Sequence, residues 1–293
     1  MINELTYETP ERPGETEAGF IETKLKEYNL LFVPPDGHMP LYIVCRKDGE
    51  AVGGLLGGTY WQRMYVRRFW IDARYRQIGL GKAIIGLAER LAAGRGCIFS
   101  GLESEIPGAL EFYRKQGYRE QMELPDFPPG LTSYALVKQL EKPVIEVQNS
   151  FSFDSALGKF QLAEDYDADA ERLIETELAN FIEDSSPNED SVRLVTLCRS
   201  GGKIVGGLSG GTSYRWLAIA YLWVDKTYRG QGIGKRLLAM AEDEARRRGC
   251  VHSRVFTHDF QAPEFYLQNS YRCQGVLPDI PPGHEQYCFI KDI

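Results

Sequence analysis

The stretch Tyr228–Lys235 reads Tyr-Arg-Gly-Gln-Gly-Ile-Gly-Lys, and its residue types are suited to holding a phosphate group. It follows the apolar run Trp216–Val224, which is typical of a buried strand, and it opens a helical pattern over Lys235–Arg248. Glycines let the backbone approach a ligand closely, and N–H groups at the start of a helix face an anion. A second version of this stretch occurs earlier, over Tyr75–Lys82.

Two other glycine-rich phosphate loops fit these residues poorly. A Walker loop needs a hydroxyl residue after its Gly-Lys pair, but Arg236 stands at that position. A dinucleotide fingerprint reads Gly-x-Gly-x-x-Gly, but Lys235 stands where its last glycine belongs. A tight strand-to-helix turn that binds no ligand remains the alternative from spacing alone.

The stretch Arg229–Gly234, read as Arg-x-x-Gly-x-Gly, resembles the acyl-CoA pyrophosphate loop of the GCN5-related N-acetyltransferases (GNAT superfamily). Two flanking segments carry the same resemblance. The preceding strand ends in Leu222–Val224, similar to the fourth strand of that family, and Ala262–Tyr266 is similar to its Ala-x-x-Phe-Tyr helix. The resemblance covers essentially the whole chain, once in each half.

The resemblance implies acetyl-CoA as co-substrate and a role for each segment. The implied pyrophosphate contacts are the loop residues Arg229, Gly230, Gln231, Gly232, Ile233, Gly234 and Lys235. Backbone N–H groups of Leu222, Trp223 and Val224 are implied to polarise the thioester, because oriented donors stabilise a developing oxyanion. Tyr266 is implied to protonate the departing thiolate, since a phenol with a pKa near 10 keeps its proton at neutral pH. From spacing alone, Tyr266 also fits a core aromatic residue.

The first half carries a partly changed version of the same site. Its implied cofactor-binding and catalytic residues are Arg76, Gly79, Gly81 and Tyr113. Gln77 replaces the first glycine of the loop and narrows the room for phosphate, and Arg67–Arg68 put charge into a strand that is apolar in the second half. We therefore expect a competent site in the second copy and a weakened or structural one in the first.

The two halves align without a gap at an offset of 153 residues, as Val52–Leu55 and Val205–Leu208 illustrate. A period this long indicates a duplicated domain rather than a solenoid. We predict an N-terminal domain over 1–140, a linker over 141–153 and a C-terminal domain over 154–293. Within the linker, the apolar residues 144–147 could add a strand.

The order of strand and helix patterns is the same in both halves and matches the order in the acetyltransferase family. We therefore predict an α+β fold of two tandem domains, each a mixed, mostly antiparallel sheet flanked by helices.

Composition excludes several classes of partner. A net charge of −7 and a calculated pI near 5.3 argue against broad binding to nucleic acid or anionic membranes. No apolar run approaches the ~20 residues that span a membrane, and Met1–Glu17 is too polar for a signal peptide, so we expect a cytoplasmic protein. The six cysteines lack paired spacing, so we expect buried thiols and no zinc or other metal.

Few residues in the sequence indicate which amine is the acceptor. Glu164–Asp190 holds eleven acidic residues and, as its only basic residue, Arg172. The first helices flank the acceptor cleft in the acetyltransferase family, so an acidic wall would attract a small cationic amine, although a solvated helix face fits equally well. His258 and Asp259 precede the Tyr266 helix and could serve as a general base or form a solvated loop pair. Asp259 and Ile106 also replace an Asn that contacts the CoA arm in that family.

These features predict an N-acetyltransferase that moves an acetyl group from acetyl-CoA to the primary amine of a small molecule by direct attack, with Tyr266 protonating the thiolate. The alternative is a non-catalytic acyl-CoA-binding protein with a regulatory or scaffold role. Neither the oligomeric state nor the identity of the amine follows from the sequence.

Overall fold

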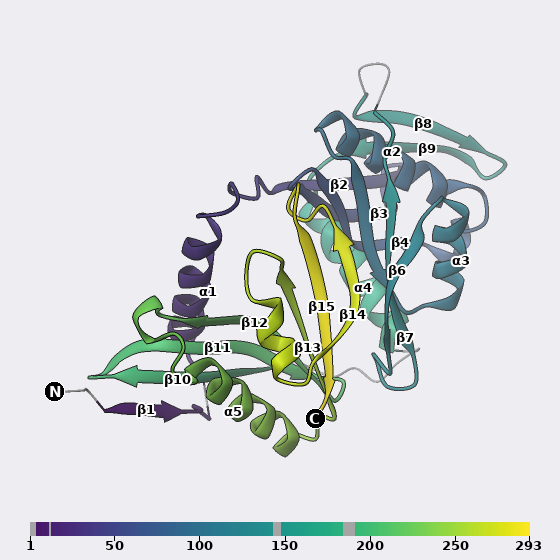
Figure 1. Cartoon of the computed structure of the whole chain (residues 1–293). Coiled ribbons are helices and arrows are strands. Elements are labelled where there is room, and N and C mark those ends of the chain that lie inside the picture. The colour runs from purple at the N-terminus through teal and green to yellow at the C-terminus, as the bar shows by residue number, and fades with distance from the viewer. Residues whose placement is uncertain (1–3, 12, 143–147, 184–190) are drawn as a thin grey trace. The chain divides into compact units, whose positions relative to one another are not determined.

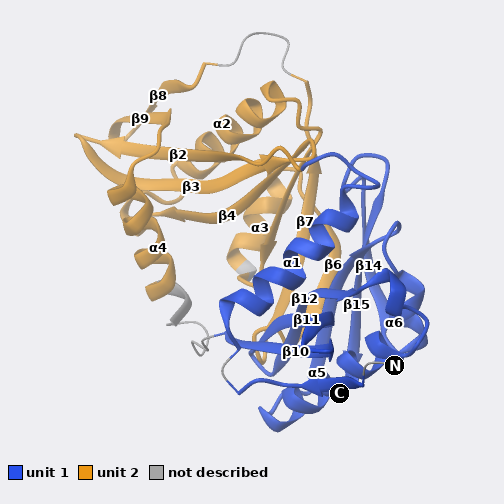
Figure 2. Cartoon of the chain, turned by 90° about the vertical axis from the view of Figure 1, so that its left-hand side faces the viewer, with its two compact units in different colours: residues 1–35, 189–293 blue, residues 36–188 orange. Residues whose placement is uncertain are grey.

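The computed structural model describes residues 4–11, 13–142, 148–183 and 191–293, so the proposed strand at 144–147 lies outside the described residues. The chain divides into two compact units, which Figure 1 labels by element and Figure 2 colours separately. Unit 1 consists of Met1–Pro35 and Glu189–Ile293, and unit 2 consists of Asp36–Asn188.

The described part of unit 1 is a seven-stranded sheet in the order β1-β10-β11-β12-β13-β15-β14. Its strands are β1 (Leu5–Glu8), β10 (Val192–Ser200), β11 (Lys203–Ser213), β12 (Trp216–Val224), β13 (His252–His258), β14 (Arg272–Pro278) and β15 (Glu285–Asp292). Its helices are α1 (Glu15–Asn29), α5 (Ile233–Arg247) and α6 (Pro263–Gln268). β12 and β13 pair in parallel because α5 crosses between them, whereas the neighbouring described strands pair antiparallel.

The described part of unit 2 is an eight-stranded sheet in the order β6-β7-β5-β4-β3-β2-β9-β8. Its strands are β2 (Met39–Lys47), β3 (Glu50–Tyr60), β4 (Arg63–Ile71), β5 (Phe99–Ser104), β6 (Arg119–Pro125), β7 (Thr132–Gln139), β8 (Ser150–Ser155) and β9 (Gly158–Glu164). Its helices are α2 (Leu80–Gly94), α3 (Pro107–Lys115) and α4 (Ala168–Glu183). The predicted α+β architecture, with two mixed and mostly antiparallel sheets, is therefore confirmed.

In unit 1 the two longer helices cover opposite faces of the sheet. Leu194 and Cys198 of β10 belong to the core under α5, whereas the alternating residues Val195 and Leu197 pack with Ile21 of α1. Successive side chains of a strand point to opposite faces of the sheet, so β10 contributes apolar side chains to the core on each face. The phosphate-loop residues lie at the N-terminal end of α5 and so at one edge of this layered core.

The first strand and helix of each repeat join the sheet built from the other repeat. β1 pairs with β10 of the second repeat, and β9 pairs with β2 of the first. A Cβ atom built on Gly207 would lie 2.6 Å from Ile21, and one built on Gly54 would lie 2.7 Å from Ile174. The absence of side chains at both glycines thus lets each exchanged helix approach its sheet.

The compact units consequently differ from the predicted ranges 1–140 and 154–293. The physical reason is that the offset of 153 residues relates Ile21 to Ile174 and Gly54 to Gly207, so both sheets offer the same surface to either helix. β8 (Ser150–Ser155) overlaps the end of the predicted linker 141–153 and extends the sheet of unit 2 beyond β9.

Candidate active site

A cleft opens in unit 1 where β12 and β13 separate. The two strands pair only over Trp216–Ile219 and His252–Val255. A bulge opposite Ser209 and Gly210 then breaks the register of β12 on its other side. Beyond this point the strands enclose a cavity of about 560 Å³, a size typical of small-molecule and cofactor sites.

The glycine loop closes one side of the cleft with exposed backbone. Arg229 fixes the loop to the end of β12 through a 3.0 Å hydrogen bond from its Nε to the carbonyl oxygen of Val224. Gly230 and Gly232 have φ values of 75° and 78°, and a Cβ atom on either would meet no atom within 4 Å. Within the described residues no side chain caps Gly232 at the start of α5, so the N–H groups of the first helical turn are available to an anion.

The third glycine of the loop has a different function. A Cβ atom on Gly234 would lie 3.4 Å from the ring of Phe265, in ordinary van der Waals contact. α5 and α6 therefore touch at Gly234, and Gly81 and Phe112 repeat this contact more tightly in unit 2, at 3.2 Å.

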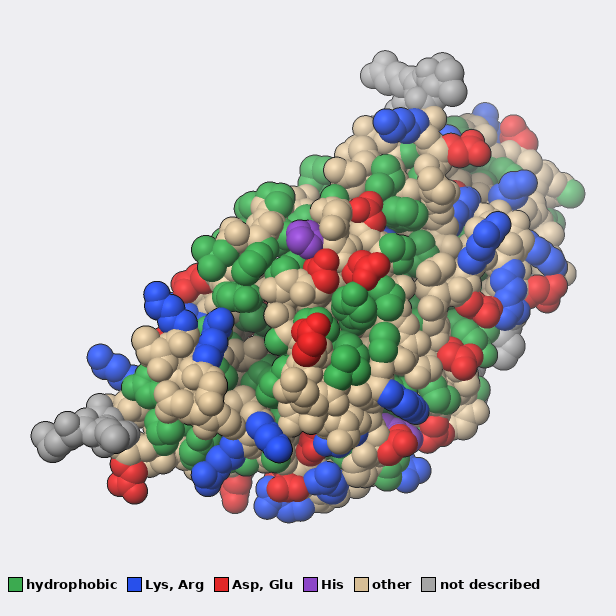
Figure 3. Space-filling model, in the orientation of Figure 1, with side chains coloured by type: hydrophobic (Ala, Val, Ile, Leu, Met, Phe, Trp, Pro, Cys, Tyr) green, Lys and Arg blue, Asp and Glu red, His purple; other side chains and the backbone are tan. Residues whose placement is uncertain are grey.

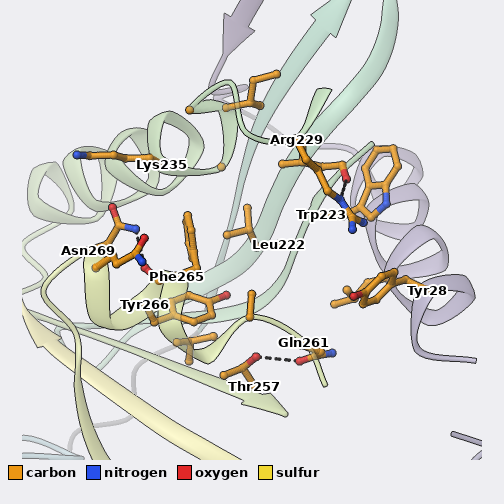
Figure 4. Close-up of a pocket in the computed structure, with 18 of the residues that line it drawn as sticks. Tyr28, Leu222, Trp223, Arg229, Lys235, Thr257, Gln261, Phe265, Tyr266 and Asn269 are labelled. Atoms are coloured by element: carbon orange, nitrogen blue, oxygen red, sulfur yellow. Dashed lines mark hydrogen bonds between the residues drawn. The ribbon is translucent and has the colours of Figure 1, made fainter. Parts of the chain in front are cut away.

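Most of the predicted second-copy site residues line this one cleft (Figure 4). They are Leu222, Trp223, Val224, Arg229, Gly230, Gly232, Ile233, Gly234, Lys235 and Tyr266. Gln231 is the exception, because it does not line the cleft and its amide instead donates to the carbonyl oxygen of Thr227 at 3.4 Å. Further lining residues that the sequence did not indicate include Leu25, Tyr28, Thr257, Gln261 and Asn269.

Tyr266 lies in the middle of the cleft. Figure 4 shows Lys235 and Asn269 on one side of it and Tyr28 and Gln261 on the other, with its hydroxyl directed toward the second group. The side chain is only 6% exposed, and this burial raises the pKa of the phenol well above its ordinary value of 10. No other described group hydrogen-bonds to the hydroxyl, so it can donate to a bound molecule.

A buried polar network supports the aromatic ring against which Tyr266 packs. The rings of Tyr266 and Tyr271 are 5.6 Å apart. The Tyr271 hydroxyl contacts Ser253 at 2.7 Å and Glu242 at 3.1 Å, and Lys291 neutralises Glu242 at 2.7 Å. Unit 2 repeats this network with Tyr118, Ser100, Glu89 and Lys138. The network therefore belongs to the duplicated fold and fixes the position of the tyrosine pair.

The family of the chain follows from comparison with known proteins. The model of the acetyltransferase (GNAT) family matches residues 4–118 and 159–271, once in each repeat. The chain belongs to the GNAT family. Its two GNAT repeats have exchanged their first strand and helix, and the cleft of unit 1 carries the loop and tyrosine of the second repeat.

Individual relatives are also acetyltransferases. The chain is 44% identical over 97 residues to a blasticidin-S acetyltransferase from Streptomyces morookaense, covering 33% of this chain and 71% of the relative. It is 34% identical over 125 residues to the acetyltransferase Atu2258 from Agrobacterium fabrum, covering 42% of this chain and 91% of that protein. A solved acetyltransferase from Bacillus cereus is 32% identical, covers 44% of this chain and 96% of its own, and has a TM-score of 0.41.

Aromatic side chains occupy the corresponding positions of unit 2. Phe69 stands where unit 1 has Leu222, and its ring centroid lies 5.9 Å from that of Phe112 and 6.4 Å from that of Tyr113. Phe153 of β8 would lie 3.6 Å from a Cβ atom on Gly79, whereas the equivalent Gly232 faces open space. In unit 2, aromatic side chains thus lie beside the tyrosine and near the glycine loop, where unit 1 has Leu222 and open space.

The glycine loop of unit 2 keeps the backbone shape of the loop in unit 1, but with backbone strain at Gln77. Arg76 donates from its Nε to the carbonyl oxygen of Ile71 at 2.9 Å, as Arg229 does in unit 1. Gln77, however, has a φ of 64°, a left-handed conformation that costs a non-glycine residue about 1–2 kcal/mol. Buried Tyr113 keeps the place of Tyr266, and burial likewise raises the pKa of its phenol.

The acidic helix that was expected to flank the acceptor cleft of the second copy belongs to unit 2 instead. This expectation is wrong because of the exchange, which packs α4 against β3 and β4. Two of its carboxylates pair with a strand of that sheet, since Arg67 contacts Glu171 at 3.0 Å and Glu175 at 3.1 Å, and Asp167, just before the helix, contacts Arg46. The positive charge that Arg67 brings to β4 is therefore complementary to the acidic helix α4 that packs on this strand.

The two residues considered as a general base do not line the cleft. His258 is buried and stacked on Phe260 at 5.1 Å, and burial lowers the pKa of its imidazole. Asp259 accepts a hydrogen bond from His284 at 3.0 Å. Within the described residues, no group of His, Cys, Asp or Glu side chains could hold a metal ion. No described helix is long and apolar enough to cross a membrane.

Proposed function

We propose that unit 1 transfers an acetyl group from acetyl-CoA to the primary amine of a small molecule. The observation that carries this proposal is the position of Tyr266, whose hydroxyl faces a cleft bounded on one side by the open glycine loop. A Cβ atom on Gly230 or Gly232 would meet no atom within 4 Å, so the backbone of this loop is open to a ligand. The fit of the loop to a pyrophosphate rests on this geometry and on the first-turn N–H groups of α5.

The proposed chemistry divides among the residues of the cleft. Backbone donors near Leu222–Val224, beyond the point where β12 separates from β13, hold the thioester oxygen as negative charge develops on it. The amine nitrogen forms a bond to the acetyl carbon and the carbon–sulfur bond breaks. Tyr266 gives its proton to the sulfur, and the phenolate regains a proton from the attacking nitrogen, which leaves a neutral amide. Because burial raises the pKa of Tyr266, the phenol enters each cycle protonated.

We further propose that unit 2 binds no acyl-CoA. Two differences support this: Phe69 is larger than Leu222, which stands at its position in unit 1, and Phe153 lies near Gly79, whereas no atom lies within 4 Å of a Cβ atom on Gly232. The first repeat would then have a structural function, because its β1 and α1 complete unit 1, while β9 and α4 of the second repeat complete unit 2.

The acceptor is proposed to be a small amine. The similarity to a blasticidin-S acetyltransferase supports a small-molecule acceptor and makes blasticidin S a useful probe. The acidic helix gives no support for a cationic acceptor, because it packs on the sheet of unit 2. On the face shown in Figure 3, acidic and basic side chains are interspersed, which does not favour a polyanionic partner such as nucleic acid there.

Two measurements test these proposals together. Calorimetric titration with CoA should give one site per chain, and release of free thiol from acetyl-CoA should depend on an amine from a panel that includes blasticidin S. CoA binding without thiol release across the panel would favour the non-catalytic alternative. Two CoA sites per chain would overturn the assignment of unit 2, and no CoA binding would overturn the proposed acetyl transfer by unit 1.

A further inference from the structure

A hydrogen-bonded pair of side chains joins the two repeats at the edge of the cleft. Gln261, in the loop between β13 and α6, donates from its Nε2 to Oδ1 of Asn29 in the last turn of α1, at 2.9 Å. Its Oε1 accepts from the backbone N–H of His258 at 3.0 Å and from the hydroxyl of Thr257 at 2.9 Å. Because a backbone N–H can only donate, the amide orientation is fixed and its NH₂ group must face α1.

The same turn of α1 also contacts the other wall of the cleft. The guanidinium of Arg229 lies 4.9 Å from the ring centroid of Tyr28, a cation–π contact. Arg229 follows β12 and Gln261 follows β13, which are the two strands that separate to form the cleft. The last turn of α1 therefore spans the opening between them.

An aromatic stack holds this turn in place. Phe32 packs on Tyr28 with 5.1 Å between ring centroids, and Phe260 stacks on Phe32 at 5.4 Å. In Figure 4, Tyr28, Thr257 and Gln261 line the part of the cleft toward which the Tyr266 hydroxyl points, away from Lys235. The last turn of α1, held by these contacts, thus forms the wall at one end of the cleft. This end lies on the side of Tyr266 opposite Lys235.

Comparison of the two repeats shows that the fold does not require the Asn29–Gln261 pair. At the offset of 153 residues, Asn29 corresponds to Ile182 and Gln261 corresponds to Gly108. Neither residue could form the same hydrogen bond with its side chain, so the pair has no counterpart at these positions of unit 2. Unit 2 nevertheless forms the same sheet and accepts its exchanged helix. The pair therefore occurs in the unit with the open glycine loop and is absent from the equivalent positions of the unit that shares only the fold.

We propose that Asn29 and Gln261 are positioning residues that hold the acceptor end of the cleft, so that a site in the second repeat depends on a helix of the first. This inference rests on the acetyl transfer proposed above. Direct attack requires the amine nitrogen to be held about 3–3.5 Å from the acetyl carbon, and a displaced wall raises the barrier without affecting the pyrophosphate loop. The pair should therefore act on the amine rather than on CoA.

The test compares three variants of the full chain with the panel amine that wild type acetylates best. Asn29→Ala removes only the bond between α1 and the loop, whereas Gln261→Met removes all three bonds of the amide. Each should lower kcat/KM for the amine about tenfold, with the larger part in kcat, and leave the CoA dissociation constant within about twofold. Because the two residues act through one bond, the double variant should fall short of the product of the two single effects.

Tyr221→Phe is the matched control. It removes another hydrogen bond between α1 and β12, from Tyr221 to Glu22 at 3.0 Å, at a residue that does not line the cleft. Its kinetic constants should equal those of wild type. Loss of thermal stability in Asn29→Ala with unchanged kinetics would overturn the inference, as would an equal loss of CoA affinity. A wild type that releases no thiol would instead overturn the proposed acetyl transfer.

Discussion

Removal of the Tyr266 hydroxyl is the sharpest perturbation of the proposed chemistry. Tyr266→Phe keeps the ring, which contacts Phe265 at 5.2 Å and Tyr271 at 5.6 Å. The hydroxyl has no hydrogen-bond partner among the described residues, so its removal should change the free energy of unfolding by less than about 1 kcal/mol. Loss of a positioned proton donor should lower turnover about 10²–10⁴-fold, which corresponds to roughly 3–5 kcal/mol in the activation barrier.

Tyr113→Phe is the matched control for this variant. Tyr113 is 7% exposed and Tyr266 is 6% exposed, and both pack against the phenylalanine that precedes them. Because Phe69 fills the space beside Tyr113, the change at position 113 should leave turnover within about twofold of wild type.

The assay is thiol release at saturating acetyl-CoA and amine, accompanied by calorimetric CoA affinity and thermal melting. CoA affinity should be nearly unchanged in both variants, since neither hydroxyl belongs to the glycine loop. Because burial raises the pKa of Tyr266 above 10, turnover should show no loss from ionisation of this phenol between pH 6 and 9. Full turnover in Tyr266→Phe would refute the donor role, and a damaging Tyr113→Phe would place the active cleft in unit 2.

Three other outcomes are expected. Gly232→Asp should abolish CoA binding in calorimetry while circular dichroism stays native, because its carboxylate would stand at the open N-terminus of α5; binding by the folded variant would show that the loop does not hold the pyrophosphate. Ile21→Ala should cost about 2–5 kcal/mol and speed amide exchange in β10–β12, whereas Ile174→Ala should do so in β2–β4; the reverse pattern would contradict the exchange. Burial lowers the folded-state pKa of His258, so its contribution to stability should be present above about pH 6.5 and be lost as the pH falls below that value; His258→Gln should flatten this dependence in melting experiments.

The sequence by itself determined the glycine loop and the tyrosine. Strand, loop and helix are contiguous from Trp216 to Arg247, so residue types and spacing report directly on their geometry. The same holds for Tyr266, three residues after Pro263 begins the short helix α6. Local backbone rules suffice here because each glycine conformation depends on its neighbours in the chain. The third glycine is a partial exception, because its contact with Phe265 involves a second helix.

Only the tertiary structure decided which helix walls each cleft. Hydrophobic pattern predicts that α1 and α4 each bury one face, but Ile21 and Ile174 are the same residue type and would meet the same glycine type in either sheet. No local signal distinguishes the two pairings, because both are tertiary contacts between the same residue types, and the observed ones join residues more than 100 positions apart. The exchange therefore brought Tyr28 and Asn29 to the cleft of the second repeat and packed the acidic helix on the sheet of unit 2. It is the physical reason that the acceptor wall could not be derived from the sequence.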